Sequence, residues 1–222
     1  MRIVAASDIH GELIEIPKCD LFILAGDLCP TRDASVFFQA NWLKDHFNKW
    51  MDQIVAKHTV FIAGNHDWIF QSHRYLLPEL GGIYLNNSPI EIEGIKIYGS
   101  PWTPFFNHWA FNFPRGDTQA ARACWDLIPD GTDILVTHGP PYGYGDLTTH
   151  DRRVIHAGCP ELLMAVRRVK PKWHFFGHFH GGCVDDTIMK MAHDDGSVTY
   201  CCNVSVLNDD YIHTKPTTMI EY

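Results

Sequence analysis

Five short clusters of Asp, Asn and His residues are spread along this chain of 222 residues. Four of them directly follow an apolar run, and such runs are typical of buried strands that end at a turn. Open sheets bind ligands beyond the carboxyl ends of their strands, so these side chains converge if the strands share a sheet. Imidazoles, carboxylates and one carboxamide together predict a metal site, with too many ligands for a single ion. The clusters are Asp8-Ile9-His10, Gly26-Asp27, Gly64-Asn65-His66-Asp67, His138-Gly139-Pro140-Pro141 and Gly177-His178-Phe179-His180.

The spacing within the clusters suits metal coordination. Asp8 and His10 lie two residues apart just after a predicted strand, so both side chains point to one side if the strand continues. His178 and His180 repeat that spacing. Asp27 follows a glycine that can supply an unusual turn, and a carboxylate has two oxygens with which to bridge two cations. The candidate ligands of two ions are therefore the two pairs, Asp8 with His10 and His178 with His180, and the bridging carboxylate of Asp27.

Two further candidate ligands lie in the remaining clusters. His138 is followed by Gly139-Pro140-Pro141, a rigid exit that fixes where its ring points. Asn65 offers a neutral oxygen, so the site gains a ligand without excess negative charge. Each cluster alone is a weak signal, because ordinary turns and helix caps use the same residues. Five clusters in this order, nearly all at strand ends, point to one site instead.

Length and composition limit the class of protein. A chain of this length with 45% apolar residues suits one large globular domain, which we place over 1–222. The formal net charge of −8 disfavours nucleic acid and anionic membrane as partners, although bound divalent cations would reverse the sign locally for a small phosphate ester. The N-terminal apolar run is too short for a signal peptide. Seven cysteines without a C-x-x-C pair fit reduced thiols, so we expect a cytoplasmic protein.

Apolar periodicity and turn residues predict the elements that carry these clusters. Helices are expected over 33–56, 69–77, from the N-cap Asp117 to about 127, and over 159–169. Strands are expected over 2–7, 20–25, 58–63, 132–137 and 172–176, with further β segments over 83–85, 89–92, 95–98, 187–192, 198–202 and 217–221. The order predicts a mixed α/β fold with two packed sheets flanked by helices.

The order D-x-H, G-D, G-N-H-D, H and G-H-x-H resembles the pattern of the calcineurin-like metallophosphoesterase superfamily, over residues 8–180. Further segments are similar to the vertebrate metallophosphoesterase-domain-containing brain proteins and their bacterial relatives, which are class III-type phosphodiesterases. Members of that family have been associated with hydrolysis of phosphodiesters, including cyclic nucleotides. Vertebrate relatives can carry Gly where this chain has His178. This sequence keeps the imidazole and so resembles a site with its full set of metal ligands. The similar segments are 97–104, 112–116, 137–141 and 158–163.

The resemblance implies a four-layer αββα sandwich of two facing mixed sheets and a full set of ligands for two divalent ions. Asp27 would bridge the two ions. The first ion would be held by Asp8, His10, Asp27 and His180, and the second by Asp27, Asn65, His138 and His178. Ligands without a thiolate suit Mn²⁺, Fe, Zn²⁺ or Co²⁺. Mg²⁺ suits this set less well, because it prefers all-oxygen shells.

The resemblance also implies a reaction. Two cations clamp the ester oxygens and lower the pKa of a bridging water, and the resulting hydroxide attacks phosphorus in line. The family counterpart of His66 lies near the leaving oxygen, so we expect His66 to act as general acid, with Asp67 orienting or tuning it. Asp67 could instead, or as well, cap the helix over 69–77.

Substrate contacts are less determined by the sequence. The segment 102–115 holds six aromatic rings that could stack a nucleobase, or could simply pack this segment onto the domain. A second candidate wall is the segment 148–153, whose alternative is a solvated turn. The candidate contacts are Trp102, Asn112, Phe113, Arg115 and Arg152.

We therefore expect a metal-dependent phosphodiesterase for small diesters, with cyclic nucleotides as the first candidates. One alternative is a phosphomonoesterase, or an enzyme that processes nucleic-acid ends, with the same metal centre. Another is a protein-binding scaffold of the same fold with little catalysis. No membrane partner is expected, and a homodimer is the default assembly.

Overall fold

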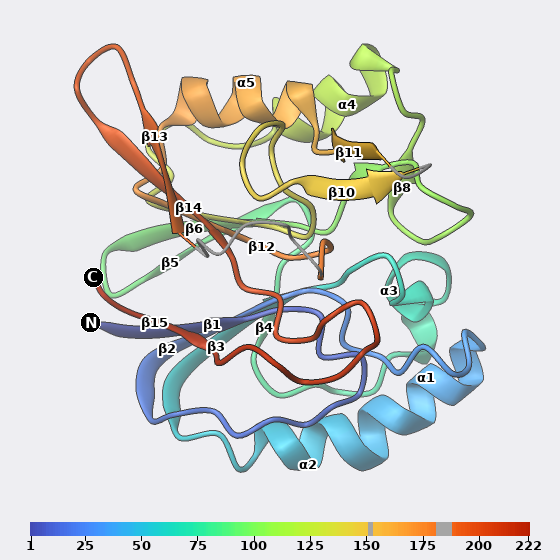
Figure 1. Cartoon of the computed structure of the whole chain (residues 1–222). Coiled ribbons are helices and arrows are strands. Elements are labelled where there is room, and N and C mark those ends of the chain that lie inside the picture. Colours follow the sequence, from blue (N-terminus) through green and yellow to red (C-terminus); the bar gives the residue numbers. More distant parts are fainter. Residues whose placement is uncertain (151–152, 181–187) are drawn as a thin grey trace.

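In the computed structural model, which describes residues 1–150, 153–180 and 188–222, two β-sheets lie face to face between helices (Figure 1). One sheet has the spatial order β15 (Thr218–Glu221), β1 (Arg2–Ala6), β2 (Cys19–Ala25), β3 (Ala56–Ile62) and β4 (Ile83–Tyr84). The other has the order β13 (Ile188–Ala192), β14 (Val198–Asn203), β12 (Trp173–Phe176), β9 (Ile134–Thr137), β6 (Ile95–Ser100) and β5 (Ser88–Ile92). The inner strands of each sheet are parallel, and β15, β13 and β5 are antiparallel edges. The predicted αββα sandwich is confirmed.

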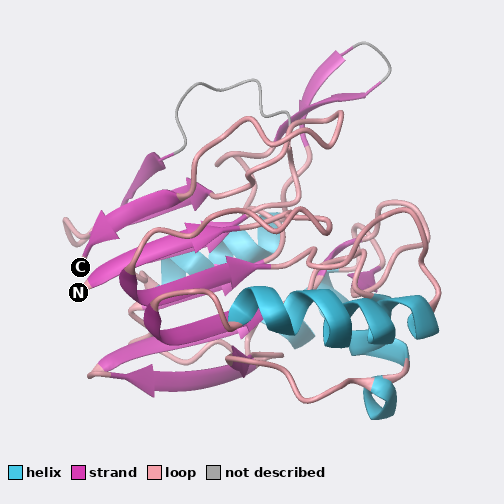
Figure 2. Cartoon of the chain, turned by 90° about the horizontal axis from the view of Figure 1, so that it is seen from below, coloured by secondary structure: helices cyan, strands magenta, loops and turns pink. Residues whose placement is uncertain are grey.

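Helices cover the outer face of each sheet. A continuous helical segment covers the five-stranded sheet and is seen from below in Figure 2. It consists of α1 (Val36–Trp42), a π-helical turn η1 (Leu43–Phe47) and α2 (Asn48–Met51). The six-stranded sheet is covered by α4 (Thr118–Trp125) and α5 (Pro160–Val169). Asp117 caps α4 as predicted, since its side chain accepts the Ala120 N–H at 3.0 Å. Two short helices, α3 (Trp68–Ser72) and η2 (Arg74–Leu76), follow β3.

Alternation along the strands divides the apolar residues among three core clusters. In β1, Ile3 and Ala5 face the opposite sheet, while Val4 and Ala6 face the helical layer of α1 and α2. Because both faces of each sheet are covered, the inner strands β1, β2 and β9 are apolar at almost every position. Each fully buried Leu, Ile or Phe stabilises the fold by roughly 1.5–3 kcal/mol relative to an exposed side chain. This packing fixes the strand ends that carry the polar clusters.

Two strand pairs were not predicted. Leu147–His150 and Arg153–His156 form the antiparallel hairpin β10–β11, and Thr103–Pro104 pairs with Asn112–Phe113 as β7–β8. The segment 148–153 contains no apolar residue, so no pattern distinguished it from a solvated turn. The predicted helix over 69–77 is interrupted at His73 and splits into α3 and η2.

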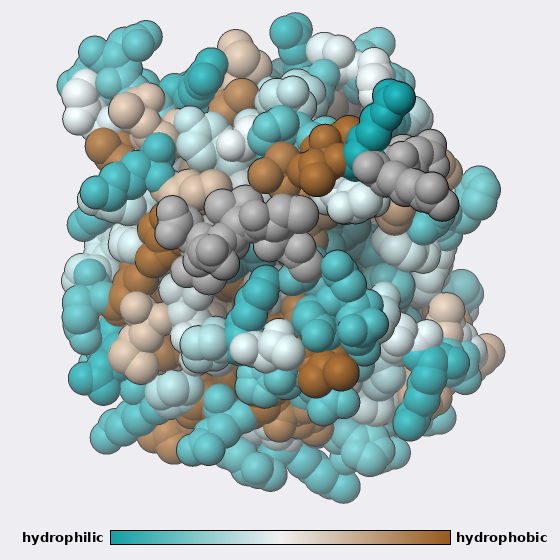
Figure 3. All heavy atoms as spheres, in the orientation of Figure 1, coloured by the Kyte–Doolittle hydropathy of each residue, from teal (hydrophilic) through white to brown (hydrophobic). Residues whose placement is uncertain are grey.

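Within the described residues, no helix combines the length and the apolarity that crossing a bilayer requires. Hydrophilic residues cover most of the face shown in Figure 3, with apolar residues scattered among them. The single domain over 1–222, the cytoplasmic location and the homodimer stay predictions.

Candidate metal centre

The five polar clusters follow β1, β2 and β3 of one sheet and β9 and β12 of the other. The strands therefore lie in two sheets, whereas the simplest form of the prediction required a single sheet. The loops after them meet because the carboxyl ends of both sets of strands open at the same edge of the sandwich. Backbone hydrogen bonds join these loops: Asp8 N–H to Gly26 O (3.0 Å), His10 N–H to Asp27 O (3.0 Å) and Gly177 N–H to His138 O (2.9 Å).

Four candidate ligands adopt left-handed backbone conformations. The φ angles are 56° at Asp8, 42° at His10, 54° at Asp27 and 71° at His178. Such angles are rare for residues other than glycine and cost of order 1 kcal/mol each. The condition that the strand continues through Asp8 and His10 is not met, since β1 ends at Ala6. The two side chains converge through tight turns, and the strain indicates a site whose geometry is imposed by the surrounding fold.

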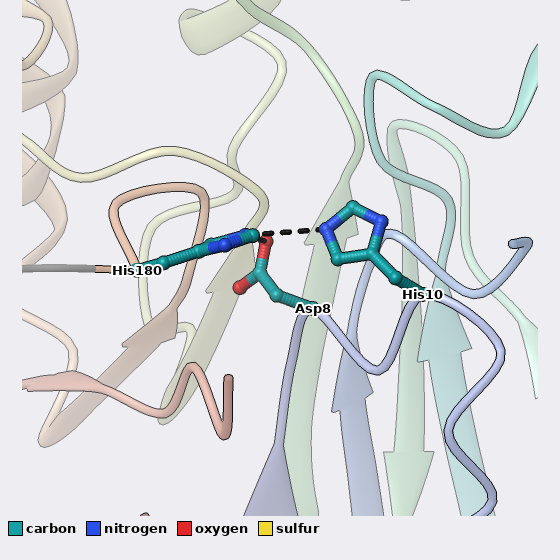
Figure 4. Close-up of side chains that lie close together, drawn as sticks. All are labelled: Asp8, His10 and His180. Atoms are coloured by element: carbon teal, nitrogen blue, oxygen red, sulfur yellow. Dashed lines mark hydrogen bonds and ion pairs between the residues drawn. The ribbon is translucent and has the colours of Figure 1, made fainter. Parts of the chain in front are cut away.

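Asp8, His10 and His180 form the first group of ligand atoms. Figure 4 shows the two imidazoles and the carboxylate turned toward one another. The Nε2 atoms of His10 and His180 lie 3.1 Å apart, and His180 Nε2 lies 3.3 Å from Asp8 Oδ1. His180 Nδ1 lies 3.3 Å from the Asn208 carbonyl, which fixes Nδ1 as the donor and leaves the Nε2 lone pair for a cation.

Asp27, Asn65 and His138 form the second group. His138 Nε2 lies 3.3 Å from Asp27 Oδ2 and 2.8 Å from Asn65 Oδ1. Its Nδ1 lies 3.0 Å from the Ala25 carbonyl, so this ring also presents the Nε2 lone pair to its group. All three side chains are buried. Nitrogen and oxygen lone pairs that converge in a buried place, with their opposite ring atoms tied to carbonyls, fit a divalent cation.

Asp27 connects the two groups. Its Oδ2 also lies 3.5 Å from His10 Nε2, which belongs to the first group. Ligand atoms lie within 4.8 Å of one another in each of three overlapping sets, namely Asp8, His10 and His180; His10, Asp27 and His66; and Asp8, Asp27 and His138. His178 is in none of these sets, although its ring centroid is 5.2 Å from that of His138 and its N–H donates to the Asp8 carboxylate at 3.0 Å. Its role as a ligand stays a prediction.

The carboxylates and imidazoles of this cluster shift one another's pKa values. Burial alone would raise the pKa of Asp27, but the imidazoles of His138, His66 and His10 outweigh it and hold this pKa well below its usual value. Burial would likewise lower the pKa of His138, but Asp27 raises it to about 9. Burial lowers the pKa of His10 to about 4. Buried ionised carboxylates are costly unless cations compensate them, and bound metal ions would supply that compensation.

Glycines of the clusters allow the loops to approach this closely. A Cβ on Gly64 would lie 2.7 Å from His138 Cε1 and would collide with the Asp27 carboxylate. A Cβ on Gly177 would collide with the carboxylate of Asp8 and the hydroxyl of Ser7. Both positions therefore need glycine because backbone packs directly on candidate ligands.

His66 lies at the mouth of the cluster. Its N–H donates to Asp27 Oδ1 at 2.8 Å, and its ring centroid is 4.6 Å from that of Trp109 and 5.0 Å from that of His10. A cavity of about 670 Å³ opens here. The cluster contributes Asp27, Asn65, His66, His178 and His180 to its lining. The remaining walls are formed by Phe106, Trp109, Arg115, Leu147, Thr148, Thr149, Ile155, His156, Ala157, Phe179, Asp209 and Tyr211.

The model of the calcineurin-like phosphoesterase family matches residues 1–182. The chain belongs to this family. It is 36% identical over 248 residues to the human and mouse proteins named metallophosphoesterase domain-containing protein 1, covering 99% of this chain and 70% of theirs. The predicted family is thereby confirmed. Because this family hydrolyses phosphoesters and the Asp and His groups could hold metal, the protein is a metal-binding phosphoester hydrolase.

Solved structures share the fold of this calcineurin-like phosphoesterase. A Haemophilus influenzae protein called NAD nucleotidase superimposes with a TM-score of 0.55 at 12% identity, covering 100% of this chain and 49% of that one. A putative 5′-nucleotidase from Staphylococcus aureus superimposes with a TM-score of 0.51 at 12% identity, covering 99% of this chain and 53% of that one. At this identity the likeness shows the fold alone.

Asp67 bonds backbone groups around the turn that carries His66. Its buried carboxylate accepts backbone N–H groups from Leu28, Cys29 and Gly64, at 2.7–3.1 Å. It precedes α3 at the N-cap position, but its side chain makes no capping bond there. Burial and the charge of Asp27 raise its pKa to about 6. Asp67 thus ties the loop after β2 to the turn that carries His66, rather than contacting the His66 ring.

Gln39 was missed by the sequence reasoning. It is fully buried in α1, donates through Nε2 to the His66 carbonyl at 2.7 Å and accepts the Ile69 N–H through Oε1 at 2.9 Å. Both ends of the amide therefore clamp the turn that presents His66. A glutamine within an amphipathic helix gives no signal of such a role in the sequence, because its partners lie 27 and 30 residues away.

Most of the predicted substrate contacts are corrected. Arg115 lines the cavity, but Phe113 packs in the core against Trp125, and the half-buried Trp102 packs onto the core against Phe111. Asn112 donates to Thr103 Oγ1 at 2.9 Å and so holds β7 to β8. Arg152 lies outside the described residues. The aromatic segment supplies two other rings to the cavity, Phe106 and Trp109, and no periodicity marked these as the exposed members.

Proposed function

We propose that this protein is a phosphodiesterase for small phosphodiesters, with cyclic nucleotides as the first candidates. The observation that carries the proposal is the position of the Asp and His cluster, which lines one part of a cavity of about 670 Å³. The volume is within the range of small-molecule sites, about 300–1,000 Å³. A cluster that could hold metal therefore adjoins a space that fits an organic group.

The ligand set suits two divalent cations. Asp8, His10, Asp27 and His180 would hold one, and Asp27, Asn65, His138 and His178 the other. Imidazole, carboxylate and carboxamide ligands favour Mn²⁺, Fe, Zn²⁺ or Co²⁺. When bound, two such cations act as Lewis acids on phosphoryl oxygens and activate water at neutral pH.

Residues of the chain supply the remaining steps. His66 donates a proton to the leaving oxygen, as its place beside Asp27 at the cavity suggests. Gln39 holds the backbone of His66, and the Trp109 ring lies 4.6 Å from its imidazole. Asp67 fixes the same turn from the other side through Gly64 N–H. These contacts orient the proton donor before substrate binds.

The walls of the cavity support a diester with an organic group. Phe106 and Trp109 offer aromatic faces, and base stacking on such faces is worth about 1–3 kcal/mol per base. The names of the structural neighbours, NAD nucleotidase and 5′-nucleotidase, keep monoester hydrolysis as the second candidate. A scaffold without catalysis is disfavoured, because every predicted ligand position is filled by a metal-binding residue type.

The experiment compares turnover of bis-p-nitrophenyl phosphate and p-nitrophenyl phosphate by the purified protein with added Mn²⁺. We expect faster hydrolysis of the diester, dependence on the metal, and loss of both activities in Asp27→Ala. Faster turnover of the monoester than of the diester would show that the protein is a phosphomonoesterase instead. No turnover of either ester in clean, metal-loaded protein would favour the scaffold. A screen of 2′,3′- and 3′,5′-cyclic nucleotides then tests the substrate.

A further inference from the structure

A buried carboxylate outside the metal cluster holds an imidazole in the cavity wall. Asp146 is fully buried, and its Oδ1 lies 2.7 Å from His156 Nδ1. Its Oδ2 accepts the N–H groups of Gly143 and Gly158, both at 3.0 Å. His156 is the last residue of β11, lines the same cavity as the cluster and has 42% of its side chain exposed. Asp146 therefore joins the base of the β10–β11 hairpin to this ring.

The bond to Asp146 fixes the tautomer of His156. An ionised carboxylate only accepts hydrogen bonds, so Nδ1 carries the proton. Nε2 then lies on the ring edge away from Asp146 and is available to a ligand. The Tyr142 ring, with its centroid 5.2 Å away, further limits the imidazole. A partly exposed side chain held in this way loses little entropy when it contacts a ligand.

The wall that contains His156 is joined to the aromatic segment. Arg115 Nη1 donates to the carbonyl of Ala157, the residue after His156, at 3.1 Å. Its Nε donates to the Phe105 carbonyl at 3.3 Å. Arg115 thus ties the hairpin to the segment that carries Trp109. The cavity beyond the metal cluster therefore has aromatic faces and one oriented imidazole nitrogen.

We infer that His156 is a specificity-determining residue, whose Nε2 hydrogen-bonds the organic group of a phosphoester while the phosphate lies at the metal cluster. Asp146 is its positioning residue. The inference rests on the proposed function and narrows the substrate class. It selects esters whose organic group carries hydroxyl, amine or ring N–H donors, such as nucleosides, over plain aryl esters, because the unprotonated Nε2 only accepts.

The decisive variant is His156→Asn. The asparagine amide reaches the place of Nδ1 and keeps the bond to Asp146, but no atom replaces Nε2. A purely structural role for His156 predicts behaviour like the parent's, whereas substrate binding predicts a loss. The control is His58→Asn, because His58 is also a partly exposed histidine paired with a carboxylate, Glu93 at 3.5 Å, and lies on β3.

The first measurement is steady-state kinetics with adenosine 2′,3′-cyclic phosphate and with bis-p-nitrophenyl phosphate, whose aryl groups carry no hydroxyl or amine. We expect His156→Asn to raise KM for the nucleotide about tenfold, the effect of one hydrogen bond. Its metal content, its Tm and its turnover of the aryl diester should stay within about twofold of the parent's. An unchanged KM for the nucleotide, or an equal loss with both esters, overturns the inference.

The second measurement does not depend on turnover. In Zn²⁺-loaded protein, the Cε1–H proton resonance of His156, assigned by its absence in His156→Asn, should move when adenosine monophosphate is added. Inorganic phosphate should leave it in place, because phosphate alone occupies only the cluster. If the chemical shift of this resonance does not change with the nucleotide while other signals show that it binds, the inference is overturned and the proposed function is left intact. A parent that hydrolyses neither ester and binds neither ligand removes the proposed function, and this inference with it.

Discussion

The pKa of His138 gives a quantitative prediction about metal binding. Burial would lower it, but the Asp27 carboxylate, 3.3 Å from Nε2, raises this pKa to about 9 in the metal-free protein. A metal ion needs the neutral imidazole, so binding at pH 7 has to displace a proton. With a pKa two units above the pH, about 99% of the rings are protonated, which weakens binding about 100-fold, or about 2.7 kcal/mol.

The sign follows from the direction of the shift. Because the pKa of His138 is raised, affinity for the metal should rise about tenfold per pH unit up to about pH 9 and then level off. The pKa of His10, which burial lowers to about 4, makes that ring neutral at pH 7, so it releases no proton. Burial would lower the pKa of His180, but its bond to Asp8 outweighs burial and raises this pKa.

Isothermal titration calorimetry of the metal-free protein with Mn²⁺ measures this release. The slope of the observed enthalpy against the ionisation enthalpy of the buffer counts the protons, and we expect the ring of His138 to contribute about one at pH 7. At pH 9.5 under nitrogen, where His138 has already lost most of its proton, the count should fall by about three quarters of a proton. A count near zero at pH 7, or the same count at both pH values, would refute the Asp27–His138 coupling.

Three further changes probe residues around the cluster. Asp27→Ala removes the carboxylate shared by both groups, so elemental analysis should find both metal positions empty or much weakened, and two well-filled ions would contradict the bridge. His178→Gly should lower turnover about tenfold or more with an unchanged circular dichroism spectrum; activity equal to the parent's would show that this imidazole is dispensable. Gln39→Leu leaves the Ile69 N–H and the His66 carbonyl without their side-chain partner. It should lower the free energy of unfolding, measured in urea, by about 2–4 kcal/mol. The control Gln119→Leu, at an exposed position of α4, should lower the free energy of unfolding by less than about 0.5 kcal/mol. Equal losses in the two variants would argue that Gln39 does not hold the turn of His66.

Local patterns were enough to predict the layers and the ligand candidates. The strand before Asp27 is apolar at almost every position, and the strand before Asn65 ends in the buried apolar run Val60-Phe61-Ile62, because both faces of their sheet are covered there. A sharp change from such a run to polar residues marks the strand end, whatever the rest of the fold does. The residue types then limit the chemistry, since imidazole and carboxylate side chains gathered at strand ends favour metal. For this reason the family pattern could be read before any coordinates.

Contacts between distant segments could not be read in the same way. Trp109 and Trp102 lie seven residues apart in one aromatic segment, yet the first lines the cavity and the second packs against the core. Gln39 looks like any helical glutamine until α1 packs against the turn after β3. These roles depend on which face of a loop or helix packs against a neighbouring segment, and the amino-acid composition does not indicate that face.

The sequence by itself determined the family, the two-sheet architecture and the identity of the candidate ligands, because these depend on residue type, order and short-range periodicity. Tertiary structure alone decided how Asp8 and His10 converge through left-handed turns, and how Asp27 comes to lie within reach of both groups. It alone paired Asp146 with His156 across the base of a hairpin. The reason is physical: backbone strain and buried hydrogen bonds are imposed by the packing of the whole fold, and that packing joins segments that are far apart along the chain.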